Sequence, residues 1–554
     1  MCDKRIACIQ QARIFERRLR EIRASAHRFE TEAGPRGKVS IGMLHQVKTI
    51  VLCGKPLDFA TLEDIGTGRG RPVADDGGME RVAAAHKVVA ERVAMGLPVY
   101  GSNTGVGSMK DRLWTADDLA EFNNSLVRAH HFGTGEFFAP AIVRMAIAIR
   151  VNTAMRGHTG CSPDLIQAFL SLLAADIIPA VRRHGSMGCA DIGLMGQIAS
   201  VLTGVGEAYY QGRLVSAETA LTEAGLKPFV MQPRDALAAL SVNAISFAAA
   251  VNVLREAASA IRVLLVTGVM SSLALGASAD PWRVAATLST RGEALVGSWL
   301  YGQSGVADWP VPTAIHDPLS LRMTAQVFGA VVDTLMVAAG RLVEATYLSD
   351  DNPVVLGGQV HSSGASLPLT TTLYIEAAQI AFSHAARNVL NRCILLSNGG
   401  RRNLSVNLVA PGEVATGLGP LMKLAVELYM RVQSLAVPLS AQSIVVAGGL
   451  EEEATFLPLI VERMETQVRD LRQLAAIEAM LSSQAIDLVG DQPQGVVKRA
   501  YDQTRSVSPI YLKDRPLSKE IEALQDAFTC HDLLRSFVAT APMPEFDDFF
   551  ALGK

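Results

Sequence analysis

The sequence predicts a mainly α-helical protein whose core is a bundle of long, nearly parallel helices. Hydrophobic residues make up 49% of the 554 residues and charged residues only 19%, so the chain carries enough apolar side chains for a large buried core. Two long stretches, 245–300 and 367–437, would form helices that are apolar on most sides, which is typical of buried helices. We expect the apolar helices within 245–280 and 367–437 to supply the bundle.

The same composition excludes several classes of function. The formal net charge of −3 argues against binding to nucleic acid or to an anionic membrane. The most apolar run, Val263–Ala279, is about 17 residues long, shorter than the roughly 20 residues of a membrane span. Seven dispersed cysteines and an N-terminus without an apolar core predict a reduced, cytoplasmic protein. No motif for a metal, a nucleotide phosphate or a dinucleotide is present, so none of these cofactors is expected.

Taken in order, the chain divides into three expected parts: a charged N-terminal extension (1–44), an N-terminal domain with active-site loops (45–245), and a helical bundle with a C-terminal helical region (246–554). The extension begins as a helix and breaks at a Gly-Pro-Arg-Gly sequence, and the glycine-rich segment 66–78 is expected to be a mobile loop. The other predicted helices are 79–94, 139–156, 164–175, 245–300, 367–397 and 418–437.

The central stretch runs from His184 to Gly206 as a glycine-rich turn that leads into a helix. Gly185 and Gly188 permit backbone shapes that other residues resist. Asp191 is a candidate cap for the helix that follows, which has a broad apolar face from Ile192 onwards. Composition alone predicts a buried helix that is preceded by a glycine-rich turn.

Four further segments carry a resemblance. Tyr100–Gly107 has the pattern Y-G-x-N-T-G-x-G, and Leu126–Gly135 contains a histidine pair bounded by glycine. Asp317–Arg322 has the pattern D-x-x-S-L-R, and Ser349–Pro353 reads S-D-D-N-P. Together these segments resemble the aromatic amino acid ammonia-lyase family, which includes histidine, phenylalanine and tyrosine lyases and related aminomutases. The resemblance covers about residues 45–525 and implies the long central helical bundle of the histidine/phenylalanine ammonia-lyase type.

The resemblance also implies roles for individual residues. Tyr100 would be the catalytic base, with its pKa lowered by helix N-termini that point at the site. Arg322 and Asn352 would hold the substrate carboxylate, because a guanidinium fork suits a carboxylate in two-point contact. The plain alternative for Arg322 is a structural salt bridge. The residues expected to bind substrate are Asn103, His130, His131, Phe132, Ser241, Asn243 and Glu451.

Several of these assignments remain open. In strict register Ser241 takes the place of the family's cofactor-contacting asparagine, and Asn243 lies two positions later, so either residue is expected to face the pocket. Glu451 opens a run of three acids that would equally complement the positive end of a helix. His130, although it lies in the family's histidine register, is as readily structural.

One departure concerns the cofactor. In the family, an Ala-Ser-Gly triad before the aspartate cyclises into an electrophilic methylidene-imidazolone. Here Cys189 and Ala190 precede Asp191, and the serine whose dehydration makes the methylidene is missing. A substrate amine must add to that ring through its nitrogen lone pair, which a quaternary ammonium lacks. A quaternary nitrogen, however, leaves readily as a neutral tertiary amine. We therefore expect a chain without the cofactor that acts on a betaine.

The family's ergothionase branch, which lacks the ring and converts ergothioneine to thiolurocanate and trimethylamine, supplies the leading hypothesis. General-base elimination would be the mechanism, and Phe132 and Glu451 would face the cation. An ammonia-lyase or aminomutase with an atypical electrophile is the first alternative, and an inactive paralogue serving as a binding subunit is the second. The resemblance further implies a homotetramer whose sites are shared between subunits.

Overall fold

The computed structural model describes residues 47–306, 308–312, 314–442 and 444–554. The predicted charged extension, 1–44, lies outside the described residues, and the three-part division of the chain stays a prediction. Residues 48–554 form a compact unit. This unit is mostly helical, as the sequence predicts.

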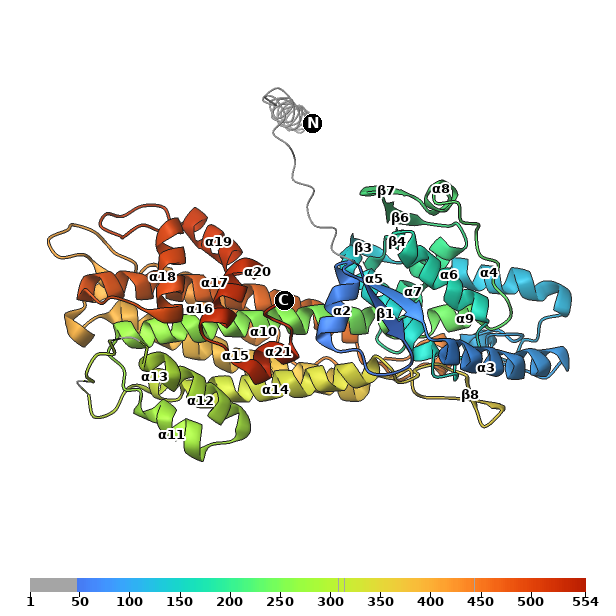
Figure 1. The fold of residues 1–554 in the computed structure, drawn as a ribbon, viewed down its shortest axis with the longest axis horizontal. Coiled ribbons are helices and arrows are strands. Elements are labelled where there is room, and N and C mark those ends of the chain that lie inside the picture. Colours follow the sequence, from blue (N-terminus) through green and yellow to red (C-terminus); the bar gives the residue numbers. More distant parts are fainter. Residues whose placement is uncertain (1–46, 307, 313, 443) are drawn as a thin grey trace, which may run out of the picture. The chain divides into compact units, whose positions relative to one another are not determined.

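Four long helices pack side by side as the core bundle (Figure 1). They are α10 (Ala244–Ala274), α14 (Thr324–Ala345), α15 (Leu369–Asn398) and α17 (Leu457–Val489). Nearly every residue of α10 is buried, because its apolar side chains extend around the whole helix. By length and composition, the segments Asp235–Ala274 and Thr324–Ala345 resemble membrane spans, but 94% of the most apolar window of the first is buried inside the protein.

The almost continuous helix expected over 245–300 is interrupted twice, after Ala274 and after Leu288. After α10, Gly276 adopts a φ of +62°, and Pro281 then lies in the first turn of the next helix. Proline is tolerated in a first turn but not in a helix interior. The remaining helices of this half are α11 (Asp280–Leu288), α12 (Arg291–Ser304), α13 (Leu319–Arg322), α16 (Leu421–Ser434), α18 (Gly495–Val507), α19 (Ser518–Ala527), α20 (His531–Thr540) and α21 (Pro544–Phe549).

The N-terminal half consists of shorter helices with small sheets. Its helices are α2 (Phe59–Gly66), α3 (Asp76–Ala94), α4 (Leu119–Ala129), α5 (Pro140–Ala154), α6 (Pro163–Ala174), α7 (Ile192–Leu202), α8 (Ala217–Glu223) and α9 (Asp235–Leu240). Its strands are β1 (Lys48–Leu52), β2 (Gly70–Ala74), β3 (Thr134–Phe137), β4 (Ile178–Pro179), β5 (Arg182–His184), β6 (Glu207–Tyr210) and β7 (Arg213–Ser216). A further hairpin, β8 (Val354–Leu356) with β9 (Gln359–His361), follows α14.

The segment 66–78 is not the mobile loop that its glycines suggest. Gly70–Ala74 forms β2, which pairs in parallel with β1, and α3 begins at Asp76. Gly70 serves this pairing, because a Cβ at that position would lie 2.2 Å from Cδ1 of Ile50. The glycine therefore reflects close packing between strands rather than flexibility.

Asp191 does not cap α7 with its side chain, contrary to the sequence prediction. Its carboxylate instead reaches the beginning of α10, where it accepts hydrogen bonds from the backbone N–H (2.9 Å) and the hydroxyl (2.8 Å) of Ser246. It also accepts a hydrogen bond from Ser186 Oγ at 2.9 Å. Complete burial raises the pKa of Asp191 to about 6. The carboxylate thus connects the glycine-rich turn to the first turn of α10.

Candidate functional site

A cavity of about 840 Å³ lies where six segments meet. These segments are the glycine-rich loop after α3, the end of α4, the turn before α7, the end of α9, the chain around the β8–β9 hairpin, and the loop before α17. Five sequence-predicted residues line the cavity: Tyr100, His130, Ser241, Asn352 and Glu451. Folding therefore brings together residues that are up to 351 positions apart in the chain.

Tyr100 is the candidate base in this cavity. Its phenolic oxygen accepts a hydrogen bond from the backbone N–H of Gly107 at 3.0 Å. Burial raises the pKa of Tyr100 and the charge of Glu451 adds to the rise, while the Gly107 hydrogen bond opposes it. The contribution of helix N-termini to this pKa stays a prediction, since the causes that act here are burial, Glu451 and the Gly107 N–H. Removal of the phenol from water outweighs the single donor that reaches it.

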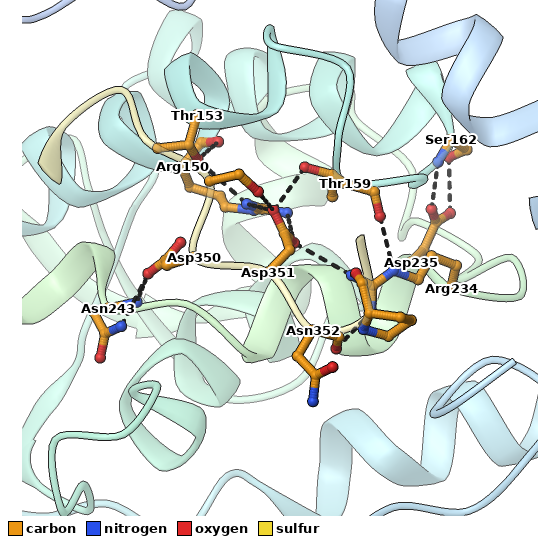
Figure 2. A network of polar contacts seen from close by, with 12 residues as sticks. Arg150, Thr153, Thr159, Ser162, Arg234, Asp235, Asn243, Asp350, Asp351 and Asn352 are labelled. Atoms are coloured by element: carbon orange, nitrogen blue, oxygen red, sulfur yellow. Dashed lines mark hydrogen bonds and ion pairs between the residues drawn. The ribbon is translucent and has the colours of Figure 1, made fainter. Parts of the chain in front are cut away.

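Asn352 lies on a loop between α14 and β8. Its Oδ1 accepts a hydrogen bond from the backbone N–H of Ser363 at 3.0 Å. The preceding Asp351 is fully buried and forms ion pairs with Arg150 at 2.9 Å and Arg234 at 3.3 Å (Figure 2). Burial alone would raise the pKa of Asp351, but the two guanidinium groups lower it below its ordinary value. The residue before Asn352 is thus an ionised, buried carboxylate.

Ser241 and Asn243 have different environments. Ser241 lines the cavity, whereas the fully buried Asn243 does not. The Asn243 amide donates to Asp350 at 3.0 Å and to the carbonyl of Ser366 at 2.9 Å. Burial raises the pKa of Asp350 to about 6, and the neighbouring charge of Asp351 adds to that rise. Asn243 therefore supports the wall of the cavity from behind.

Three other predicted binding residues also lie outside the cavity lining. The Asn103 side chain bridges the Leu97 carbonyl and the Val99 N–H, and so holds the glycine-rich loop in shape. The His131 ring lies beside Gly206, and burial lowers its pKa. The Phe132 ring covers Gly193, where a Cβ would approach it to 2.4 Å. A Cβ at position 193 would also lie 2.4 Å from the backbone carbonyl oxygen of Gly185, so the turn and the Phe132 ring together require glycine there.

Arg322 ends the short helix α13 in the bundle half of the chain and does not line the cavity. Its Nε is buried, and within the part of the chain that the structure describes it has no hydrogen-bond partner. No carboxylate of these residues forms a salt bridge with its guanidinium. Within one copy of the chain, the two predicted carboxylate ligands are therefore separate.

The cavity also contains charged residues that sequence reasoning did not single out. Arg92 and Lys110 line it from the α3 side, and His361 lines it from β9. Glu452 and Glu453 follow Glu451 along the same wall. The run of three acids was visible in the sequence, but only the fold shows that all three border the cavity. Arg92, Lys110 and His361 lie in no recognisable motif.

The residues of the central turn do not fit the family's ring cofactor. Ring closure would join the nitrogen of Ala190 to the carbonyl carbon of Gly188, and dehydration would need a serine between them, where this chain has Cys189. In the structure the Ala190 N–H donates to the Ser366 carbonyl at 3.1 Å, and the Gly188 carbonyl accepts from Thr455 Oγ1 at 2.6 Å. Burial raises the pKa of the Cys189 thiol. These contacts use the two backbone groups that ring closure would join.

Comparison with known proteins shows the family of the chain. The sequence profile described as aromatic amino acid lyase matches residues 57–506. A histidine ammonia-lyase of Paracidovorax citrulli is 29% identical over 86% of this chain and 95% of its own length. The crystal structure of an ergothionase from Treponema denticola, in complex with desmethyl-ergothioneine sulfonic acid, is similar with a TM-score of 0.85 and 27% identity, over 88% of this chain and 100% of that one.

Other solved structures share this fold. A phenylalanine aminomutase from Pantoea agglomerans has a TM-score of 0.81 at 21% identity, over 88% of this chain and 99% of its own. Because the family profile covers most of the chain, and the relatives match along nearly their whole length, the assignment does not depend on any single motif. The chain belongs to the aromatic amino acid lyase family.

Proposed function

We propose that this protein is a carbon–nitrogen lyase that eliminates trimethylamine from ergothioneine, giving thiolurocanate without a methylidene-imidazolone. The observation that carries the proposal is the pairing of two features in one cavity. The central turn contains Cys189 and Ala190 in place of the ring-forming triad, while Tyr100 and Asn352 are retained. A family member that keeps the base and a carboxylate ligand but has lost the amine acceptor suits a substrate whose nitrogen needs no activation. The structural similarity to an ergothionase supports the same substrate.

The reaction balances without any co-reactant. The phenolate of Tyr100 takes the β-proton of the substrate, and the electron pair of that C–H bond forms the carbon–carbon double bond. The bond between the α-carbon and nitrogen breaks with its pair remaining on nitrogen, which leaves as neutral trimethylamine. The proton on Tyr100 then returns to solvent.

Substrate charge explains how a buried phenol with a raised pKa acts as a base. A trimethylammonium group next to Tyr100 favours the phenolate, so it opposes the effects of burial and of Glu451. Glu451, Glu452 and Glu453 border the same cavity and give it a negative wall that favours a cation. A substrate with a permanent positive charge therefore helps to ionise its own base.

The carboxylate of the substrate would be held by Asn352 and by Arg322 of a second copy. Arg322 has a buried, unpartnered Nε among the described residues and does not reach the cavity of its own chain. Large apolar side chains are exposed on α15 and α16, including Leu373 (51%), Ile380 (44%) and Met430 (50%). Such a surface is typical of an interface between subunits, which supports a homotetramer with shared sites.

The test is incubation of the purified protein with ergothioneine, with histidine, phenylalanine and tyrosine in parallel. We expect thiolurocanate absorbance and trimethylamine from ergothioneine, and no ammonia from the three amino acids. The intact mass should equal the sequence mass, and borohydride should not inactivate the enzyme. A mass deficit of two waters, or ammonia release from an amino acid, would refute the proposal.

A second candidate is a histidine ammonia-lyase with an atypical electrophile, favoured by the similarity in sequence to histidine ammonia-lyases. Such an enzyme needs an electron-poor group in the turn around Cys189, which borohydride would reduce. The same pair of measurements, ammonia from histidine and the intact mass, distinguishes this candidate from the first.

A further inference from the structure

Arg234 is a fully buried arginine directly behind the candidate site. It precedes α9 in a left-handed conformation with a φ of +85°. Its Nε donates to the Thr159 carbonyl at 2.9 Å, and its two terminal nitrogens donate to the carbonyls of Asn352 (3.3 Å) and Pro353 (2.8 Å). One terminal nitrogen also contacts Asp351 at 3.3 Å. Figure 2 shows this guanidinium between the Thr159 segment and the Asn352–Pro353 loop.

Charge neutralisation does not account for Arg234. Asp351 already has a two-point partner in Arg150, whose terminal nitrogens lie 2.9 and 3.2 Å from its carboxylate oxygens. A second buried guanidinium costs desolvation that Asp351, already paired with Arg150, offsets only in part, and the charge of the nearby Asp235 contributes less than that of Asp351. The difference between the two arginines lies in their other contacts. Among the described residues, Arg150 otherwise donates only to the Thr153 hydroxyl. Arg234 instead binds backbone carbonyls of two segments, Thr159 on one and the consecutive Asn352 and Pro353 on the other.

These backbone contacts determine where the Asn352 side chain lies. The guanidinium holds the carbonyls of Asn352 and Pro353 on the buried side of the loop, and the Asn352 side chain extends away from the ion pairs (Figure 2). The Ser363 N–H then fixes Oδ1 of Asn352, which leaves its Nδ2 as the donor for a ligand in the cavity. Planar, five-donor arginine suits such a multiple carbonyl contact, and lysine does not reproduce it.

We propose that Arg234 is a positioning residue for substrate binding: by holding the backbone of Asn352 and Pro353, it aims the Asn352 amide at the substrate carboxylate. The identity of that ligand rests on the proposed function, whereas the positioning of the loop does not. The expected consequence is a separation of roles between two arginines that share one carboxylate. Arg150 stabilises the fold, and Arg234 sets the geometry of the site.

The first test needs no substrate. Arg234→Lys and the matched control Arg150→Lys are compared by hydrogen exchange, measured by mass spectrometry with residue-level fragmentation across 359–366. We expect the Ser363 amide to exchange at least roughly tenfold faster in R234K, because the loss of one hydrogen bond changes an equilibrium by about that factor. R150K should retain the wild-type rate at Ser363. Equal rates in R234K and wild type overturn the proposal, as does an R234K protein that fails to fold, because Arg234 would then act in stability.

The second test uses ergothioneine turnover. R234K should raise KM roughly tenfold with a smaller change in kcat, since the contact to the carboxylate is a charge-assisted hydrogen bond. In an Asn352→Ala background the same change should have no further effect on KM, whereas R150K and N352A should combine additively. Additive effects of R234K and N352A overturn the proposal. A wild-type protein that does not convert ergothioneine refutes the proposed function alone, and the exchange experiment still decides the role of Arg234.

Discussion

Replacement of Tyr100 by phenylalanine tests the proposed chemistry most directly, because it removes one oxygen and little else. The ring of Tyr100 stays in place among the residues that line the cavity, so the shape of the site is kept. The lost contact is the hydrogen bond from the Gly107 N–H at 3.0 Å. The expected stability cost is about 1 kcal/mol, the usual contribution of one such bond.

The expected loss of activity is much larger than this stability cost. General-base catalysis typically contributes about 10²- to 10⁴-fold, which corresponds to roughly 3 to 5 kcal/mol in the barrier. We therefore expect kcat/KM of Tyr100→Phe to fall by at least 10²-fold while the protein remains folded at the assay temperature. Because the expected increase in the reaction barrier is several-fold larger than the expected loss of stability, unfolding cannot account for the loss of activity.

The assay follows thiolurocanate absorbance and trimethylamine release, with thermal unfolding of each protein measured in parallel. Tyr511→Phe is the matched control. Its buried phenol also accepts a backbone hydrogen bond, from Arg515 at 3.2 Å, but it does not line the cavity. This control should keep its activity. A Tyr100→Phe enzyme within tenfold of wild type would show that another group is the base, and the reasoning would fail.

Three further predictions concern charge and assembly. The charge of Glu451 raises the pKa of Tyr100, so Glu451→Gln should move the alkaline rise of kcat/KM to lower pH; an unchanged pH profile would contradict this. The folded-state pKa of Asp350 is raised to about 6, so its contribution to stability is fully present below about pH 4 and lost as pH rises through 6. The free energy of unfolding should therefore fall between pH 4 and 7, and Asp350→Asn should make this fall smaller by about 2 to 3 kcal/mol. Denaturant titration at each pH measures it, and an unaltered fall would refute the raised pKa of Asp350. Finally, Tyr100→Phe and Arg322→Ala proteins that are each inactive should regain partial activity when refolded together, because some mixed sites hold both intact residues; no recovery would argue against shared sites.

Local patterns were sufficient to predict much of the fold. The apolar periodicity after Asp191 predicts a helix over the residues that form α7, and the apolar stretches 367–397 and 418–437 correspond to α15 and α16. These predictions succeed because the spacing of apolar residues that defines one face of a helix is visible within a short stretch of sequence. The glycines of 66–78 misled the prediction, because glycine is used there for close packing of two strands, and the partner strand is not local.

The candidate site also separates what local sequence patterns predict from what depends on contacts between distant residues. The sequence by itself determined the family, the presence of Cys189 and Ala190 before Asp191, and five residues that line the cavity. Only the tertiary structure decided that Tyr100 and Asn352 share a cavity, that Asn243 lies behind its wall, and that Arg322 lies elsewhere in the same chain. It also decided the direction in which the pKa of Tyr100 shifts, which depends on burial and on the charge of a residue 351 positions away. Desolvation and charge act through space, so no pattern along the chain contains them.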